Sequence, residues 1–412
     1  MPKVKLTSEG LKNSLKHYDI KDSIVEYVWN GFDANAKKID IVTEKNELDA
    51  ITKILIKDDG FGIDYNELEN KFGPAYVSEK KGKTDAEFLN IKGKKGVGRY
   101  SFYEIASSAS WETTFKSADS KNKTYIVNIK ANDLVNYIPT EPKETSSNTG
   151  TIVTLSLNNN INMDEIIQEL KIVFAWYLQL YKEKSIFIDG IPLNCSDILY
   201  SEETRNFDID GFKTQITICV WIRKLNEEYS KYYYIDGENN VRHKENTTLN
   251  NKGDNFYHSV FIKSSLFNKE IFNFNSSLED GNLINLKTQR TKEFKDLKLE
   301  CDKFLVEIRK PFIKEYAKSF IKKLKEKKVY PQYNANNSVD KFKEEQLDNL
   351  IANVYYFVPK VFVSLNIIQQ KTLIRLFELI LDSGETENLF KILGDVTELT
   401  SQERQDMAEL LN

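Results

Sequence analysis

A chain of 412 residues exceeds the size at which one hydrophobic core usually stops growing, so we expect two or three domains. Its hydrophobic content of 40%, with 12% aromatic residues, excludes wholesale disorder. A formal net charge of −4 argues against a generally basic nucleic-acid-binding protein, although a local basic stripe remains compatible with it.

The sequence carries few signs of other protein classes. No apolar run approaches the length of a membrane span, and the N-terminal MPKVKLTSEG lacks the apolar core of a signal peptide. The three cysteines and three histidines are scattered, without the spacing of a disulfide framework or a zinc site. We therefore expect a cytoplasmic protein with no membrane segment and no structural metal.

The first 160 residues alternate between helical and strand-like runs. They predict a helix over about 22–37, the strands KIDIV and KILIKD, a loop rich in Gly and Lys, a helix near 98–108, and the strands WETTFKS, TYIVNIK and TIVTLSL. This order indicates an α/β domain whose later strands follow one another as in an antiparallel sheet.

The pattern changes at MDEIIQELKIVFAWYLQLY, a strongly apolar helix followed by the strands SIFIDG, TQITICVWIRK and KYYYIDG. We predict a second α/β domain over 165–295 and a helical region over 296–412. The helical region begins with a long amphipathic helix dense in lysine. We hypothesise that this helix contacts nucleic acid or an acidic partner, with a solvated face as the alternative. Its basic residues are Arg309, Lys310, Lys314, Lys318, Lys322, Lys323, Lys325, Lys327 and Lys328.

The stretch EYVWNGFDANAK places polar residues along one side of the first predicted helix. Glu26, Asn30 and Asp33 recur at positions i, i+4 and i+7, so two carboxylates and one amide share a stripe. The other side of the helix is apolar, with Trp29 and Phe32 among its residues. Taken alone, the stripe has a simpler interpretation as a solvated helix face.

A second motif, DDGFG, begins at the last residue of the strand KILIKD. A carboxylate at a strand end, here Asp58, can accept a hydrogen bond from the exocyclic amine of a buried base. Gly60 and Gly62 would let the backbone and a ligand approach closely. The alternative is a hairpin turn, because Asp-Gly is a common turn dipeptide.

A third motif, GKKGVGRYSFYEIA, lies further along the chain and opens a predicted helix. Backbone amides at Gly93, Gly96, Val97 and Gly98 could hold a phosphate at the start of that helix. A flexible linker is the alternative for such a loop. The segment between Asp64 and Lys92, rich in Lys and Gly, would be a lid that closes on the ligand.

Joined in this order, the motifs resemble those of the GHKL ATPase superfamily, the Bergerat fold of gyrase B, MutL, MORC proteins, heat-shock-ninety chaperones and sensor histidine kinases. The matching positions are Glu26, Asn30, Asp33 and Ala34 in the first motif, Asp58, Gly60 and Gly62 in the second, Gly93, Gly96 and Gly98 in the third, and Gly150 and Thr151 in a closing Gly-Thr.

The resemblance implies a role for each polar residue of these motifs. Asn30 would bind the Mg²⁺ that bridges the phosphates, Glu26 would be the general base that orients the attacking water, and Asp33 would lie near the nucleotide. Asp58 would bind the adenine amine, with Thr151 supporting it. The expected cofactors are therefore ATP and Mg²⁺.

The resemblance also implies a fold. We expect an α/β Bergerat sandwich over 1–160, with helices on one face of a mixed, mainly antiparallel sheet. A smaller transducer-like, ribosomal-S5-like α/β domain would follow over 165–295, before the helical region.

Within this second domain, GNLINLKTQRTKEF resembles the loop that sends a Lys or Arg to the γ-phosphate. Its candidates are Lys287, Gln289 and Arg290, with Arg290 preferred because its planar fork matches phosphate oxygens; a surface turn is the alternative.

Two functions remain open from the sequence. The first is a Mg²⁺-dependent, ATP-hydrolysing switch, an ATP-gated homodimeric clamp that acts on nucleic acid or a protein client. The second is a low-turnover nucleotide sensor that regulates or recruits a separate effector protein. The presence of Glu26 favours the first function. The chain ends on a predicted helix, which is compatible with its being the front part of a longer protein.

Overall fold

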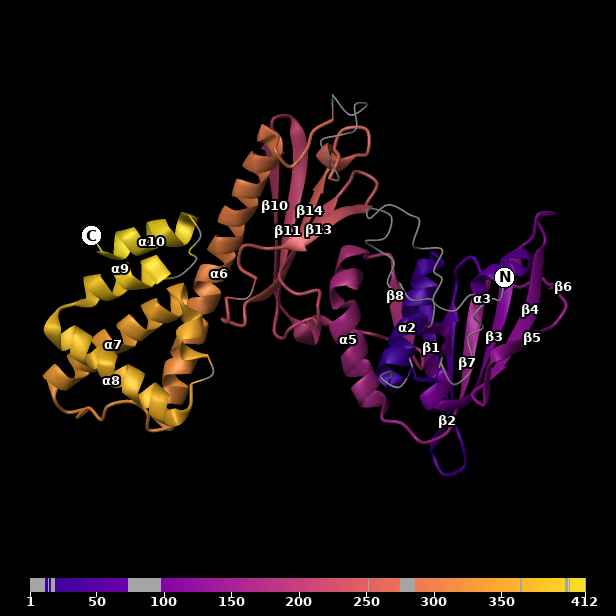
Figure 1. Cartoon of the computed structure of the whole chain (residues 1–412), viewed down its shortest axis with the longest axis horizontal. Helices are drawn as coiled ribbons and strands as arrows, with labels where there is room; N and C mark the ends of the chain where they lie inside the picture. Colours follow the sequence, from indigo (N-terminus) through magenta and orange to yellow (C-terminus); the bar gives the residue numbers. More distant parts are fainter. Residues whose placement is uncertain are drawn as a thin grey trace, which may run out of the picture. The chain divides into compact units, whose positions relative to one another are not determined.

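The computed structural model describes residues 12, 13, 15, 19–72, 98–250, 252–274, 286–363, 365–396, 399 and 401–411. The chain divides into two compact units (Figure 1). The first unit comprises Met1–Leu199 with Leu225–Glu228 and Val241–His243, and the second comprises the remaining segments up to Asn412.

A mixed, mainly antiparallel sheet forms the centre of the first unit. Within the described ranges its strand order is β5-β4-β3-β7-β2-β1-β8-β9, with β6 paired to β4. Only the pairing of β1 with β8 is parallel among these described strands. The strands are β1 Lys38–Lys45, β2 Ile51–Asp58, β3 Ala106–Lys116, β4 Asn122–Lys130, β5 Asp133–Pro139, β6 Lys143–Glu144, β7 Gly150–Leu157, β8 Ser185–Ile188 and β9 Ile191–Pro192.

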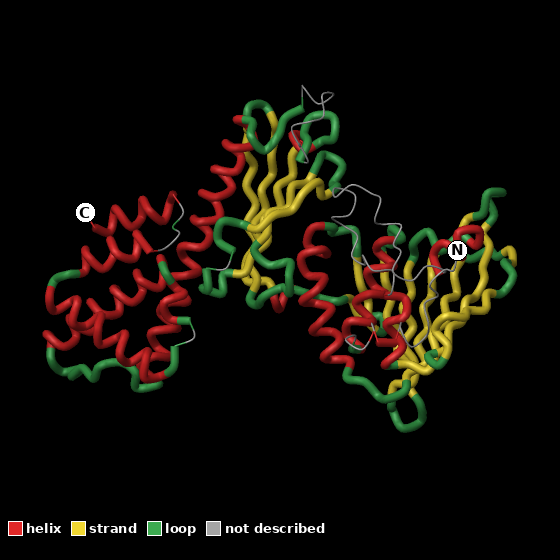
Figure 2. Tube along the Cα trace, viewed as in Figure 1, coloured by secondary structure: helices red, strands yellow, loops and turns green. Residues whose placement is uncertain are grey.

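Helices α2 (Ile20–Asp33) and α5 (Met163–Leu180) cover one face of this sheet (Figure 2). A capping box between Asp19 and Asp22 starts α2. Aromatic rings join the two helices: the Trp29 ring centroid lies 4.5 Å from that of Phe174. The shorter helical segments of this unit are η1 Tyr65–Glu67, α3 Leu68–Phe72, η3 Gly98–Glu104 and η4 Ser196–Ile198.

The first unit extends further along the chain than the predicted first domain. The sequence analysis assigned α5 and β8 to the second domain, whereas β8 pairs with β1, with Ile39 opposite Ile186. The apolar character of α5 was visible in the sequence. Its packing partner was not, because that contact joins residues about 145 positions apart.

The third motif also begins a different element from the one predicted. A helix was expected near 98–108, but a 3-10 helix covers only Gly98–Glu104 and β3 begins at Ala106. From there β3 alternates in burial, since Ala109 and Trp111 are buried and pair with β7 on one side and β4 on the other. Long-range pairing therefore outweighs the local helical pattern.

The second unit joins a sheet to a group of helices through one continuous hydrophobic core. Its described strands lie in the order β10-β11-β14-β12-β13. They are β10 Leu199–Ile209, β11 Phe212–Trp221, β12 Lys231–Ile235, β13 Val241–Asn246 and β14 Tyr257–Ser264, with η5 at Ser265–Phe267. The helices are α6 Lys292–Glu326, α7 Ser338–Phe357, η6 Pro359–Phe362, α8 Ile367–Ser383, α9 Thr386–Val396 and α10 Ser401–Leu411.

Helix α6 contributes to both parts of this core. Its first half packs toward the sheet, with the Phe294 ring 5.4 Å from the ring of Tyr234. Its second half packs against α7, where the rings of Phe320 and Tyr355 are 5.1 Å apart. The predicted division between 295 and 296 therefore falls at the start of a helix that belongs to both. In the described part of the chain, no helix is long and apolar enough to cross a membrane.

Candidate nucleotide-binding site

Helix α2 carries the polar stripe of the first motif on its less buried side. Trp29 and Phe32 are buried in the core, whereas Asn30 is exposed and both Glu26 and Asp33 are half-buried. The stripe is therefore neither a fully solvated face nor part of the hydrophobic core. Half-burial leaves Glu26 and Asp33 accessible to a ligand while limiting their hydration.

The described part of the third motif, from Gly98 onward, packs directly against this stripe. A Cβ atom placed on Gly98 would lie 2.0 Å from Oε1 of Glu26, so the glycine backbone contacts the carboxylate. Two hydrogen bonds hold the segment there: the Tyr27 hydroxyl donates to the carbonyl of Arg99 (2.9 Å) and the Ser23 hydroxyl to that of Ser101 (2.9 Å). Glu26 and the last glycine of the third motif are thus brought together.

Asp58 occupies the end of β2, beside β7. Its Oδ1 accepts hydrogen bonds from the backbone N–H of Gly60 (2.9 Å) and that of Thr151 (3.3 Å), and it lies opposite Thr151 in the strand register. Burial raises the pKa of Asp58 to about 6 even though these two hydrogen bonds favour the charged form, and the neighbouring Asp59 adds to the increase. A carboxylate kept largely ionised at neutral pH in a desolvated position is a strong hydrogen-bond acceptor.

The adjacent Asp59 has a separate, structural contact. Its Oδ1 accepts from the backbone N–H of Lys37 (2.7 Å) and that of Lys38 (2.9 Å), which fixes the turn between α2 and β1. Asp58, and not Asp59, therefore stays a candidate for ligand binding.

Close backbone packing joins the first and second motifs. A Cβ on Gly31 would lie 2.4 Å from Cδ1 of Ile39 and 3.0 Å from Cβ of Asp58, and one on Gly60 would lie 2.5 Å from the carbonyl oxygen of Ala34. The sequence analysis did not select Gly31. Its place directly after Asn30 was the available signal, because a glycine inside a helix often marks close approach.

Thr113 is a second residue that the sequence analysis missed. Its hydroxyl lies 3.1 Å from the hydroxyl of Thr151 and accepts from the backbone N–H of Ile63 (2.9 Å). Gly62 adopts a φ of 72°, and its backbone approaches that of Thr114 so closely that a Cβ would lie 2.0 Å from the Thr114 carbonyl oxygen. The second motif is thus secured to β3 and β7 by the residues around Thr113.

Two further groups of residues were predicted for this site. Gly93, Gly96 and Val97 lie outside the described residues. Lys287 and Arg290 belong to the second unit, where Lys287 forms an ion pair with Glu293 and holds the pKa of that carboxyl below its usual range. Arg290 is exposed.

Comparison with known families agrees with this geometry. Residues 18–154 match the family model described as histidine kinase-, DNA gyrase B-, and HSP90-like ATPase. This part of the chain belongs to the GHKL ATPase superfamily. The GHKL domain accordingly has the fold expected from the motifs, a mixed sheet packed with helices, and its family supports ATP binding.

Comparisons over the whole chain are less informative than the GHKL match. Among solved structures, the ATPase domain of Aquifex aeolicus MutL complexed with ADP matches at 15% identity, covering 60% of this chain and 91% of that chain with a TM-score of 0.31. None of the curated proteins compared with the chain matches it.

The side chains of the GHKL domain fit a nucleotide with a phosphate-bound cation. The described residues contain no group of three or more His, Cys, Asp or Glu side chains that could hold a metal ion. Mg²⁺ at a nucleotide commonly keeps several waters and takes one or two protein ligands, the phosphates supplying the rest. A single exposed amide such as that of Asn30 suits this type of coordination.

Proposed function

We propose that this protein is a Mg²⁺-dependent ATP-binding and ATP-hydrolysing switch that works as an ATP-gated dimeric clamp. The proposal rests on the half-buried Asp58 carboxylate at the end of β2, whose pKa is raised to about 6. Among the described residues, backbone N–H groups donate to its Oδ1 only. Its other oxygen, Oδ2, would accept the exocyclic amine of adenine. Membership of the GHKL superfamily supports the same ligand.

Glu26 is the proposed general base. Its half-buried carboxylate contacts the backbone at Gly98, which limits its conformations before any substrate is bound. A base held in one position accepts a proton from water more effectively than a mobile one. The protein would thus contribute orientation and proton transfer at the Oε atoms of Glu26.

Asn30 is the proposed Mg²⁺ ligand, and Asp33 would lie near the nucleotide, one helical turn further along α2. The bound cation would offset the negative charge that develops on the phosphates. Backbone amides at Gly93, Gly96 and Val97 are proposed phosphate donors by their match to the family motif. Thr151 would support Asp58, as its backbone N–H already donates to that carboxylate.

A basic residue of the second unit is proposed to bind the terminal phosphate. Arg290 is the better candidate, because Lys287 would first have to leave its ion pair with Glu293. An interaction that exists only while the terminal phosphate is present would distinguish ATP from ADP. This difference would couple hydrolysis to the arrangement of the chain, and through it to a nucleic-acid or protein client.

Glu26→Ala tests the catalytic assignment. We expect ATP affinity in calorimetry to be retained while turnover falls by about a hundredfold or more, the usual scale for loss of a general base. Glu47→Ala, in the exposed turn after β1, is the control and should hydrolyse ATP normally. Normal hydrolysis by Glu26→Ala would reject the assigned base. ATP binding without turnover in the unaltered protein would favour the sensor.

A further inference from the structure

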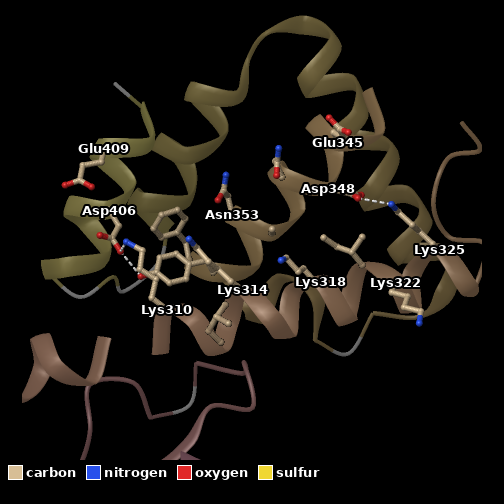
Figure 3. Close-up of a pocket in the computed structure, with 16 residues that line it drawn as sticks. Lys310, Lys314, Lys318, Lys322, Lys325, Glu345, Asp348, Asn353, Asp406 and Glu409 are labelled. Carbon is tan, nitrogen blue, oxygen red and sulfur yellow. Dashed lines mark hydrogen bonds and ion pairs between the residues drawn. The ribbon is translucent and has the colours of Figure 1, made fainter. Parts of the chain in front are cut away.

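The second unit contains a large groove between α6, α7 and α10 (Figure 3). Its volume is about 1060 Å³, which is at the upper end of the range for small-molecule sites. Apolar side chains form part of its lining, among them Ile313 and Ile321 of α6 and Ala352 and Phe357 of α7. The groove is therefore suited to an elongated ligand with an apolar side.

One wall of the groove is a row of lysines on α6. Lys310, Lys314, Lys318 and Lys322 repeat every four residues, so their side chains leave the same side of the helix about 6 Å apart. In Figure 3, Lys314 and Lys318 point from α6 toward the α7 side of the groove. The row presents positive charge with the period of an α-helix.

Only some of these amines are already neutralised. Lys310 forms an ion pair with Asp406 (3.3 Å), and Lys325, which closes the row, forms pairs with Glu344 (2.7 Å) and Asp348 (2.8 Å). Within the described part of the chain, Lys314 and Lys318 have no carboxylate at ion-pair distance, and both are exposed. The middle of the row is thus available to an anionic partner.

The adjoining Arg309 does not belong to this surface, although the sequence hypothesis included it. Its guanidinium is fully buried and forms ion pairs with Asp254 (2.8 Å) and Glu403 (3.0 Å). Its position one residue before Lys310 turns it toward the core instead of the groove.

The opposite wall of the groove carries carboxylates, which limits the kind of anion that can bind there. It carries Glu345 and Asp348 from α7 and Asp406 and Glu409 from α10, and Asn353 lies between them. A nucleic-acid backbone, negative along its whole length, would bring phosphates close to Glu345 and Glu409, which is unfavourable. A helix with carboxylates along one edge only can face the lysines while its other edge meets the carboxylates and amides.

We propose that this groove binds an acidic amphipathic helix of a partner protein. Carboxylates at i, i+4 and i+8 of that helix would match the spacing of Lys314 and Lys318 and their neighbours in the row, and an apolar ridge would enter the groove. This surface lies wholly within the second unit, so the proposal is independent of nucleotide binding.

Selection from a displayed library of random peptides, with the full chain as target, tests this proposal. We expect the recovered peptides to combine acidic residues at helical spacing with an apolar ridge. Fluorescence anisotropy should then show that Lys314→Glu/Lys318→Glu weakens their binding by about tenfold or more, since two favourable charge pairs become repulsive. The control, Lys295→Glu/Lys323→Glu, makes the same charge change at exposed α6 positions outside the groove and should bind normally.

Three results would overturn the proposal. They are equal binding of the recovered peptides to the Lys314→Glu/Lys318→Glu protein, recovery of no binding peptide, and binding of labelled single-stranded or duplex DNA that depends on these two lysines. Unchanged melting temperatures of both double variants would show that the differences come from the surface and not from unfolding.

Discussion

Asp58 and Asp59 are neighbouring carboxylates with different surroundings. Asp59 secures the turn before β1 through two backbone donors, while Asp58 stays half-buried with a raised pKa and no cationic partner in any contact described for it. Burying a charge without a counterion destabilises the folded protein. Such a position is typical of a residue retained for binding.

The first prediction concerns the stability effect of Asp58→Asn. The pKa of Asp58 is about 6 in the folded protein, above the ordinary value of 3.8. Between these pH values the folded state binds more protons than the unfolded state, so the free energy of unfolding of the wild type falls as the pH rises from 3.8 through 6. Asparagine keeps the Oδ1 acceptor and carries no charge. We expect Asp58→Asn to raise the free energy of unfolding by up to about 3 kcal/mol at pH 8, with the gain shrinking toward pH 4.5. Urea denaturation at both pH values measures it.

The same substitution should weaken ATP binding. An amide that presents N–H groups to the adenine amine leaves a mismatched donor, so calorimetry should show ATP affinity reduced at least about tenfold. Asp59→Asn, which also keeps an acceptor for its two backbone donors, is the matched control and should bind ATP as wild type. A more stable Asp58→Asn protein with undiminished ATP affinity would place the nucleotide elsewhere.

At the scale of elements, the site depends on how closely α2, β2 and η3 approach one another. Glycines permit this approach: Gly31 lets α2 lie against β2, and Gly98 lets η3 lie against Glu26. On the buried side of α2, the ring of Trp29 packs against aromatic rings of α5. The position of Glu26 is thus determined from both sides of its helix.

Gly98→Ala tests this arrangement. The new methyl group would overlap the Glu26 carboxylate, the mobile end of a side chain, so we expect the fold to survive while Glu26 is displaced. Turnover should fall by about tenfold or more, because small displacements of a catalytic group have large effects on rate. Gly237→Ala, where the nearest atom is an ordinary 3.4 Å away, is the control. Full activity in Gly98→Ala would show that the contact does not orient the base.

The helices of the second unit depend on a buried charge cluster. Arg309 of α6 joins Asp254, Glu403 of α10 and the carbonyl oxygen of Tyr356 in α7, at 2.8 to 3.0 Å. All three charged side chains are almost fully buried, so none can be solvated if its partner is lost. The cluster thus connects three helices to the loop before β14.

Arg309→Leu should destabilise the second unit by about 3 to 5 kcal/mol, because it removes the cation beside the buried Asp254 carboxylate, whereas Glu403 keeps its ion pair with Lys252. Urea denaturation followed by circular dichroism measures the loss. Lys303→Ala, which breaks an exposed ion pair with Glu300, should change the stability by less than about 0.5 kcal/mol. Adding Asp254→Asn to Arg309→Leu should recover part of the loss, and no recovery would indicate that packing, not charge, is responsible.

At the scale of the whole molecule, the proposed switch predicts ATP-dependent dimerisation. A charge-assisted contact to the terminal phosphate contributes about 1.5 to 3 kcal/mol, enough to change a two-state equilibrium roughly ten- to a hundredfold. Light scattering after size exclusion should show Glu26→Ala becoming dimeric with ATP and less associated with ADP. Adding Arg290→Ala should weaken this change and leave ADP affinity nearly unaltered.

Two outcomes would argue against that account. An identical mass with ATP, with ADP and without nucleotide would count against the clamp and favour the sensor. Loss of ADP binding in Arg290→Ala would show that Arg290 supports the fold instead of binding the terminal phosphate.

The motifs alone were enough to predict an ATP-binding GHKL domain. The order of the motifs predicts Asp58, Glu26 and Gly98 as site residues because each lies at a strand end or on a helix face that the chain specifies over a few residues, and their roles stay predictions. Superfamily membership and the mixed sheet followed from the same local patterns and are confirmed.

The segments far apart in sequence that share a core or a surface became visible only in the folded chain. It paired β8 with the first sheet and packed α5 against α2. It also moved Arg309 from the basic helix face into a buried cluster and left Lys314 and Lys318 facing a groove. Periodicity gives the side of a helix on which a residue lies. It does not give the partner on that side, because packing between residues far apart in sequence depends on the whole chain at once.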